Sequence, residues 1–109
     1  MSDSISEVTP TELAALLATE DPPLLLDVRE PAELEISSLP GAVNIPMNQL
    51  IRRIEELPKD REVVVICRSG SRSGMVTEYL VSAGFSRVKN LSTGLNGWAR
   101  DVDPTIRQY

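Results

Sequence analysis

One stretch of sequence, residues 63–74, decides the fold: it reads VVVICRSGSRSG. Its first four residues are β-branched and apolar, a pattern typical of a strand that is buried on both faces of a parallel sheet. From about Gly74 to Ala83, apolar residues repeat at helical spacing. Cys67, the only cysteine of the chain, therefore stands at a turn between a predicted strand and a predicted helix.

The residues after Cys67 are small, polar or basic, as suits a loop that binds an anion. At a strand-to-helix turn, several main-chain N–H groups can converge on one negative charge. A helix N-terminus and nearby arginines lower the pKa of a thiol, and the thiolate is the nucleophile. We therefore predict that Cys67 is catalytic and that Arg72 clamps an oxyanion. The predicted substrate-binding residues are Arg68, Ser69, Gly70, Ser71, Arg72 and Ser73.

The rest of the chain alternates between strand and helix patterns. Thr9 and Glu12 form a predicted capping box around Pro10, which marks a helix start. Strands are predicted at 24–28, 42–45, 62–66 and 87–91, and helices at 10–20, 50–57, 74–83 and 94–103, with one helical turn at 32–36. This alternation predicts an α/β fold with a mainly parallel sheet flanked by helices, as a single domain over residues 1–109.

Two charged residues are expected to lie near Cys67. In open parallel sheets, ligands bind beyond the carboxyl ends of the strands. Asp27 and Arg29 follow the predicted strand 24–28 at that end, as Cys67 follows its own strand. We predict that Asp27 and Arg29 form an ion pair or brace the loop, in a supporting role and without direct chemistry.

Composition excludes several classes of function. The 109 residues carry a net charge of −5, which argues against a general nucleic-acid binder. Without histidine and with one cysteine, neither a zinc site of the usual kind nor an imidazole base is available, and we expect no metal and no cofactor. The polar N-terminus and the lack of long apolar runs predict no secretion signal and no membrane association. A lone cysteine fits a reducing compartment, so a cytoplasmic location is expected.

Four motifs occur in an order that resembles one family. They are LLDVREP at 25–31, LPGAVNIP at 39–46, CRSGSRS at 67–73 and NLSTGLNGW at 90–98. Together they resemble the rhodanese (sulfurtransferase) superfamily, and single-domain rhodaneses in particular, over about residues 6–103. The resemblance implies a small three-layer rhodanese-like domain, with Cys67 at the centre of the active loop.

The resemblance also implies an activity. Cys67 would take a sulfane sulfur from a small sulfur-donor anion such as thiosulfate, or from a persulfide, and hold it as a Cys67 persulfide. A thiophilic acceptor, such as a thiol or a sulfur-carrier protein, would then remove the outer sulfur. Asp27 and Arg29 match family positions that shape or hold the loop. No general base is needed if the loop already holds a thiolate.

Two other functions stay open at this point. A domain of the same fold could act as a sulfur relay or regulatory binding module without turnover. Phosphatase or arsenate reductase chemistry is disfavoured, because related cysteine phosphatases have five residues between cysteine and arginine and this chain has four. The chain also departs from the family, with Ser37-Ser38 in place of Gly-His and Thr93-Gly94 in place of two glycines. These departures bear on substrate preference.

Overall fold

The computed structural model describes residues 5–109 and contains one sheet whose strands are all parallel. The strand order is β1-β5-β4-β2-β3. The strands are β1 (Glu7–Val8), β2 (Leu24–Asp27), β3 (Val43–Asn44), β4 (Val63–Ile66) and β5 (Val88–Leu91). The predicted α/β fold with a mainly parallel sheet is confirmed. The two-residue β1 was not predicted, because it is too short to show a period.

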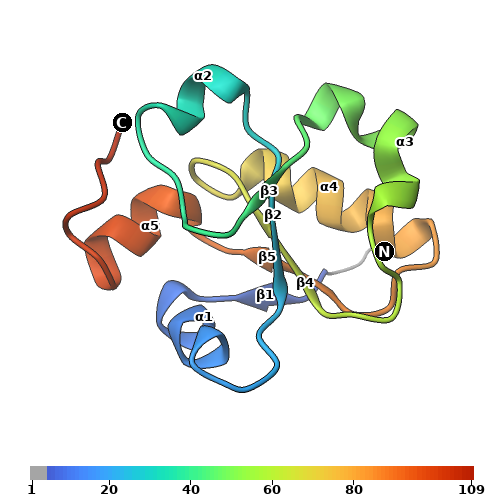
Figure 1. Cartoon of the computed structure of the whole chain (residues 1–109), viewed down its shortest axis with the longest axis horizontal. Coiled ribbons are helices and arrows are strands. Elements are labelled where there is room, and N and C mark those ends of the chain that lie inside the picture. The colour runs from blue at the N-terminus through green and yellow to red at the C-terminus, as the bar shows by residue number, and fades with distance from the viewer. Residues whose placement is uncertain (1–4) are drawn as a thin grey trace.

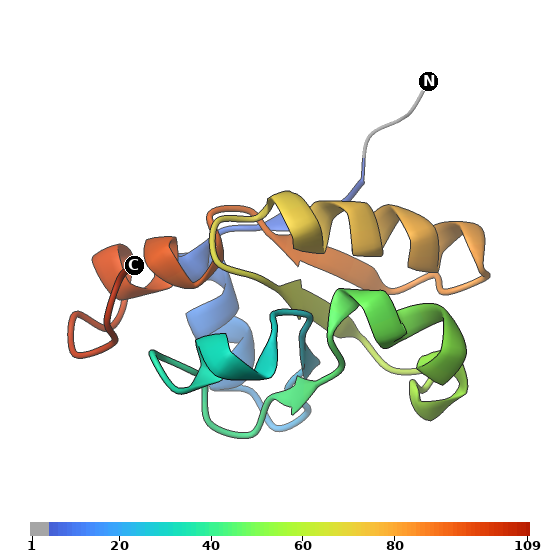
Figure 2. The same ribbon diagram turned by 90° about the horizontal axis from the view of Figure 1, so that it is seen from above.

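Helices cover both faces of this sheet and make three layers (Figures 1 and 2). On one face lie α3 (Leu50–Arg53) and α4 (Ser71–Ser82), with the 3₁₀ turns η1 (Met47–Gln49) and η2 (Ile54–Glu56) beside α3. On the other face lie α1 (Pro10–Leu17) and α5 (Gly94–Asp101). The single turn α2 (Pro31–Leu34) follows the carboxyl end of β2. None of the helices in residues 5–109 has both the length and the apolar character needed to cross a bilayer.

The central strand β4 contributes side chains to the hydrophobic clusters on both faces of the sheet. Val63 and Val65 pack into the cluster that contains α4, and Val64 and Ile66 pack into the cluster that contains α1 and α5. All four side chains are fully buried, which explains the uninterrupted apolar run in the sequence. Because β4 pairs with β2 and β5, Cys67 emerges at the middle of the carboxyl edge.

The helix after Cys67 begins earlier than predicted. Periodicity placed its start near Gly74, but α4 begins at Ser71, because the first turn is polar and carries no apolar period. Gly70 adopts φ 104°, which turns the chain from the loop into the helix. The first turn of α4 thus includes Ser71 to Ser73, and its N–H groups have no partner inside the helix. The predicted capping box of α1 is present, with Thr9 N donating to Glu12 and Glu12 N to Thr9.

Candidate active site

The thiol of Cys67 is fully buried and also faces hydrogen-bond donors. The residue has 0% exposure and packs in the same apolar cluster as Val28 and Val76. Its Sγ accepts a hydrogen bond from the N–H of Gly70 at 3.0 Å and from the hydroxyl of Ser73 at 3.2 Å. A sulfur that is merely structural in an apolar core does not have such donors directed at it.

These donors determine the charge of the sulfur. Burial raises the pKa of the Cys67 thiol, but hydrogen bonds from the Ser73 hydroxyl and from the amides of Ser73, Gly70 and Ser69 lower it by more. The net effect is a pKa below that of an ordinary cysteine. We call this arrangement of three amides and one hydroxyl around Sγ the amide cradle. It favours a thiolate without any imidazole base.

Helix α5 explains why the amides face the sulfur. Its first free N–H groups, those of Leu95 and Asn96, donate to the carbonyls of Cys67 and Arg68 at 2.9 and 3.0 Å. Each peptide carries its C=O and N–H on opposite sides, so binding the Arg68 carbonyl to α5 turns the N–H of Ser69 the other way. That N–H is one of the groups that lower the Cys67 pKa.

Two glycines allow this close approach. Gly94, at φ 64°, lies against the Arg68–Ser69 peptide, and a Cβ there would overlap the carbonyl oxygen of Arg68. Gly70 lies against the carbonyl of Ser92 in the same way. The active loop and the start of α5 are therefore packed backbone to backbone. The departure at Thr93 leaves this contact intact, because Gly94 supplies the positive φ.

Asn90 on β5 orders the hydroxyl of the cradle. Its side-chain amide donates to the Gly70 carbonyl and to Glu7, both at 3.1 Å. This leaves the amide oxygen facing the buried Ser73 hydroxyl, with which it forms a short hydrogen bond. The Ser73 hydroxyl thus lies between two acceptors, the Asn90 amide oxygen and the Cys67 sulfur, and its one proton is donated to one of them at a time. The sequence motif contained Asn90, but nothing in it pointed to this contact.

Asp27 and Arg29 form a buried ion pair at the carboxyl end of β2. Arg29 donates from Nη2 and Nε to the Asp27 carboxylate at 2.8 and 3.0 Å, and both residues are at most 1% exposed. Arg29 also donates to the main-chain carbonyls of Ser37 and Glu33. The pair therefore ties β2 to α2 and to the segment after it. This agrees with the predicted ion pair, and a brace on the loop at 67–73 stays a prediction.

Arg72 is held by a carboxylate that the sequence did not single out. Its Nη1 and Nη2 donate to the two oxygens of Glu33 at 2.7 and 2.9 Å. The Tyr109 hydroxyl donates to the same carboxylate at 2.6 Å. The Arg72 hydrogen bonds, above all, hold the pKa of Glu33 at about 2. Glu33 stands in an acidic run with Glu30 and Glu35, a pattern typical of a solvated face, but its side chain is only 18% exposed.

Tyr109 also contacts the other two arginines of this region. Its hydroxyl accepts from Arg29 Nη1 at 2.9 Å, and the Arg68 guanidinium lies 4.8 Å from the centre of its ring, within cation–π range. Its main chain exchanges two hydrogen bonds with the Asn96 side chain at 3.0 and 3.2 Å. The tail thus returns to the edge of the active loop. We call Arg29, Glu33, Arg68, Arg72 and Tyr109 the arginine cluster.

The structure therefore separates the predicted loop residues into three groups. Cys67, Gly70 and Ser73 meet at the sulfur, together with the amide of Ser69. Arg68 and Arg72 instead have their side chains in the arginine cluster. Ser71 is exposed and begins α4. The hydroxyl groups of Ser69, Ser71 and Ser73 were all predicted to bind substrate, and that of Ser73 lies within hydrogen-bond distance of the Cys67 sulfur.

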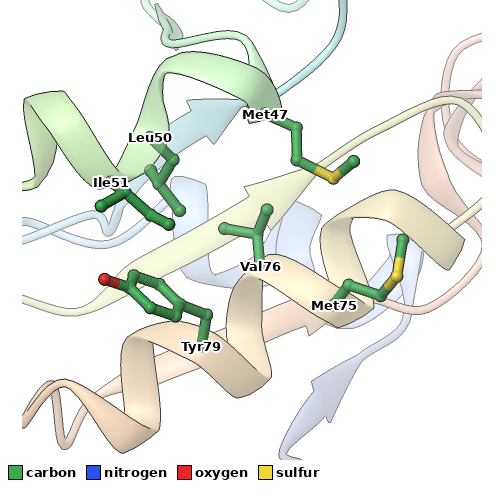
Figure 3. Close-up of a pocket in the computed structure, with 6 residues that line it drawn as sticks. All are labelled: Met47, Leu50, Ile51, Met75, Val76 and Tyr79. Carbon is green, nitrogen blue, oxygen red and sulfur yellow. The ribbon is translucent and has the colours of Figure 1, made fainter.

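An apolar groove lies beside the loop helix, between α3 and α4 (Figure 3). It has a volume of about 210 Å³. Ile51 and Met75 on its sides are 70% and 56% exposed, while Val76 at its base packs into the same cluster as Cys67. The lining residues are Met47, Leu50, Ile51, Met75, Val76 and Tyr79. The lining residues carry no carboxylate, cation or thiol.

Comparison with known proteins places this arrangement in a family. Residues 9–101 match the family model described as a rhodanese-like domain. A sulfurtransferase of Allochromatium vinosum is 40% identical over 102 residues, which cover 94% of this chain and 95% of that protein. The putative sulfurtransferase YtwF of Bacillus subtilis is 37% identical, with 92% and 96% covered.

A solved structure agrees with these sequence matches. The crystal structure of a rhodanese-like domain protein from Staphylococcus aureus superposes with a TM-score of 0.84 at 27% identity, covering 96% of this chain and 99% of that one. The fold and the length thus agree with proteins of similar size. The chain belongs to the rhodanese-like sulfurtransferase family, and its single cysteine is buried directly after the central strand β4.

Proposed function

We propose that this protein transfers sulfane sulfur and that Cys67 carries the transferred atom as a persulfide. The observation that carries the proposal is the pair of donors at 3.0 and 3.2 Å from Sγ, the Gly70 N–H and the Ser73 hydroxyl. They stabilise the thiolate before the reaction and a persulfide anion after it. The names of the relatives support transfer of sulfur but do not specify a donor.

The first half-reaction is a displacement at sulfur. The Cys67 thiolate attacks the outer sulfur of the donor, a new S–S bond forms, and the bond between that sulfur and the rest of the donor breaks. The departing group takes the electron pair and leaves as sulfite from thiosulfate or as a thiolate from a thiol persulfide. Residues 68–73 bind the donor, and Asp27 and Arg29 hold the loop.

The second half-reaction regenerates the thiolate. An acceptor thiolate attacks the outer sulfur of the Cys67 persulfide, and Cys67 leaves with the bonding electrons. The amide cradle stabilises this leaving group with the same hydrogen bonds, so it assists both half-reactions. We propose a small thiol or a sulfur-carrier protein as the acceptor. Cyanide is a convenient substitute in an assay, because it is converted to thiocyanate.

The test is the mass of the intact protein after exposure to a donor. The reduced protein is mixed with thiosulfate, and separately with a thiol persulfide, and is then weighed. The expected result is a gain of one sulfur atom, which cyanide removes. A Cys67→Ser variant should gain no sulfur. If neither donor loads a protein whose thiol is titratable, the proposal is wrong.

The complete burial of Cys67 favours a second candidate function, a sulfur relay that works only with a partner protein. Such a relay would accept sulfur slowly from small donors and turn over slowly with cyanide. The thiocyanate assay separates the two functions. Many turnovers without a partner support an independent enzyme, and loading without turnover supports the relay.

A further inference from the structure

The arrangement of charges around Cys67 is unusual for a site that would bind a dianion. Arg72 is held by both oxygens of Glu33, and Arg29 is held by Asp27 in the same way. Among residues 5–109, Arg68 is the arginine of the cluster that contacts an aromatic ring instead of a carboxylate. The positive charges of the three arginines are therefore matched in number by three negative groups of this region, namely Asp27, Glu33 and the Cys67 thiolate.

Glu33 is built to stay ionised and in place. Besides the two bonds from Arg72, its carboxylate accepts hydrogen bonds from the Tyr109 hydroxyl and from the main-chain N–H of Glu30, at 2.6 and 2.9 Å. With a pKa of about 2, this carboxylate is negatively charged throughout the neutral range. A donor anion that required Arg72 would have to break a bidentate, charge-assisted pair.

The amide cradle supplies a different kind of stabilisation. Its donors are main-chain amides and a hydroxyl, which carry partial charges and are directed at one atom, Cys67 Sγ. This arrangement suits a single charge that moves between two sulfur atoms during transfer. A second full charge on the departing group, as on sulfite, has no such donor in the cradle. Arg72 is already paired with Glu33, so among residues 5–109 Arg68 is the guanidinium of the cluster without a carboxylate partner.

We propose that Glu33 determines the donor class of this site, so that donors with one negative charge react in preference to the thiosulfate dianion. The inference rests on the proposed sulfur transfer and deepens it. The preferred class comprises thiol persulfides and thiosulfonates. From such a donor R–S–S⁻, the Cys67 thiolate takes the outer sulfur to form the Cys67 persulfide anion, and the S–S bond of the donor breaks to release the thiolate R–S⁻. From a thiosulfonate, it takes the outer sulfur and releases a sulfinate.

Two donors that differ by one charge allow a direct test. Thiosulfate and methanethiosulfonate both present a terminal sulfur on an oxidised sulfur atom, but a methyl group replaces one charged oxygen in the second. The measured quantity is kcat/KM for each donor with cyanide as acceptor, expressed as the ratio of thiosulfate to methanethiosulfonate. Glu33→Gln should raise this ratio on the order of tenfold, because it frees the Arg72 guanidinium for the second charge.

Three further variants separate this effect from a general disturbance. Glu35→Gln removes a charge from an exposed residue next to α2 and should leave the ratio unchanged. Arg72→Gln alone leaves Glu33 without its cation and should lower the ratio. In the double variant Glu33→Gln with Arg72→Gln, the gain should disappear, since no guanidinium remains to be freed. Thermal unfolding checks that each variant is folded.

The outcomes distinguish the inference from the proposed function. An unchanged ratio in Glu33→Gln, or a gain that persists in the double variant, overturns the role of Glu33 even when sulfur loading is normal. A wild-type protein that prefers thiosulfate also overturns it. If the wild type gains no sulfur from either donor, the proposed function itself has failed.

Discussion

The amide cradle and the arginine cluster lie on either side of the same loop, yet they are built in opposite ways. The cradle uses neutral donors close to Cys67 in sequence, and all of them are directed at its sulfur. The arginine cluster uses full charges from distant parts of the chain, and two of its three cations are held by carboxylates. The comparison teaches that hydrogen-bond dipoles directed at Sγ lower the Cys67 pKa most directly, while Arg72 adds an attraction between its charge and the thiolate. The arginines fix the shape of the site.

The largest effect on sulfur transfer is expected from removing the Cys67 sulfur, the atom that the amide cradle surrounds. Cys67→Ala should abolish sulfur loading and thiocyanate formation, because no other thiol is present. The fold should persist, with a loss in the free energy of unfolding of about 1–2 kcal/mol for the lost core contacts. Mass spectrometry and urea unfolding measure the two quantities. Residual turnover in this variant would show that the nucleophile lies elsewhere.

A substitution at Gly94 should disturb the amide cradle through its contact with the Arg68–Ser69 peptide. An alanine Cβ would overlap the Arg68 carbonyl, so the loop must shift and its amides must turn away from Sγ. We expect Gly94→Ala to lower the free energy of unfolding by about 2–3 kcal/mol and to slow transfer on the order of a hundredfold.

Gly41 provides the matched control for this variant. It has a comparable φ of 81°, but no atom lies within 4 Å of a Cβ built there. Gly41→Ala should therefore cost only the backbone strain, about 1 kcal/mol, and leave the transfer rate unchanged. Equal rate losses in the two variants would show that packing between α5 and the loop does not orient the amides.

A smaller effect is expected from one donor of the cradle. Ser73→Ala removes the hydroxyl bond to Sγ and should raise the Cys67 pKa, because that bond lowers it in the wild type. Loading by thiosulfate should then fall about fivefold at neutral pH and recover as the pH rises, since the thiolate re-forms. The pH dependence of the rate checks this. Ser82→Ala, at an exposed position at the far end of α4, should show the wild-type profile.

The cradle could be predicted from sequence because its parts are local. Cys67, Gly70 and Ser73 lie within seven consecutive residues between a strand and a helix, and the uninterrupted apolar run of β4 predicts a parallel sheet. The start of α4 was misplaced because its first turn is polar. These inferences depend on short-range patterns, which a single sequence does display.

The arginine cluster could not be predicted, because its contacts join distant residues. Arg72 and Glu33 are 39 positions apart, and Tyr109 is 76 positions from Glu33. No periodicity relates them, and a glutamate among other acidic residues has the pattern of a solvated face. Their meeting depends on how α2, α4 and the tail are placed at the carboxyl edge of the sheet, which is a property of the whole fold.

The smallest expected effect is on stability at low pH, and it tests the arginine cluster most directly. The pKa of Glu33 is lowered from 4.5 to about 2 in the folded protein, so its pair with Arg72 adds stability in full above pH 4.5. That contribution falls as the pH drops from 4.5 to 2, where the unfolded chain binds the proton first. The difference in unfolding free energy between wild type and Glu33→Gln should thus be constant from pH 7 to 5 and shrink below pH 4.5. Glu56→Gln, which breaks an exposed pair with Arg53, should show little difference at any pH. A Glu33 difference that stays constant from pH 7 down to pH 3 would mean that Arg72 does not hold the pKa of Glu33 down in solution.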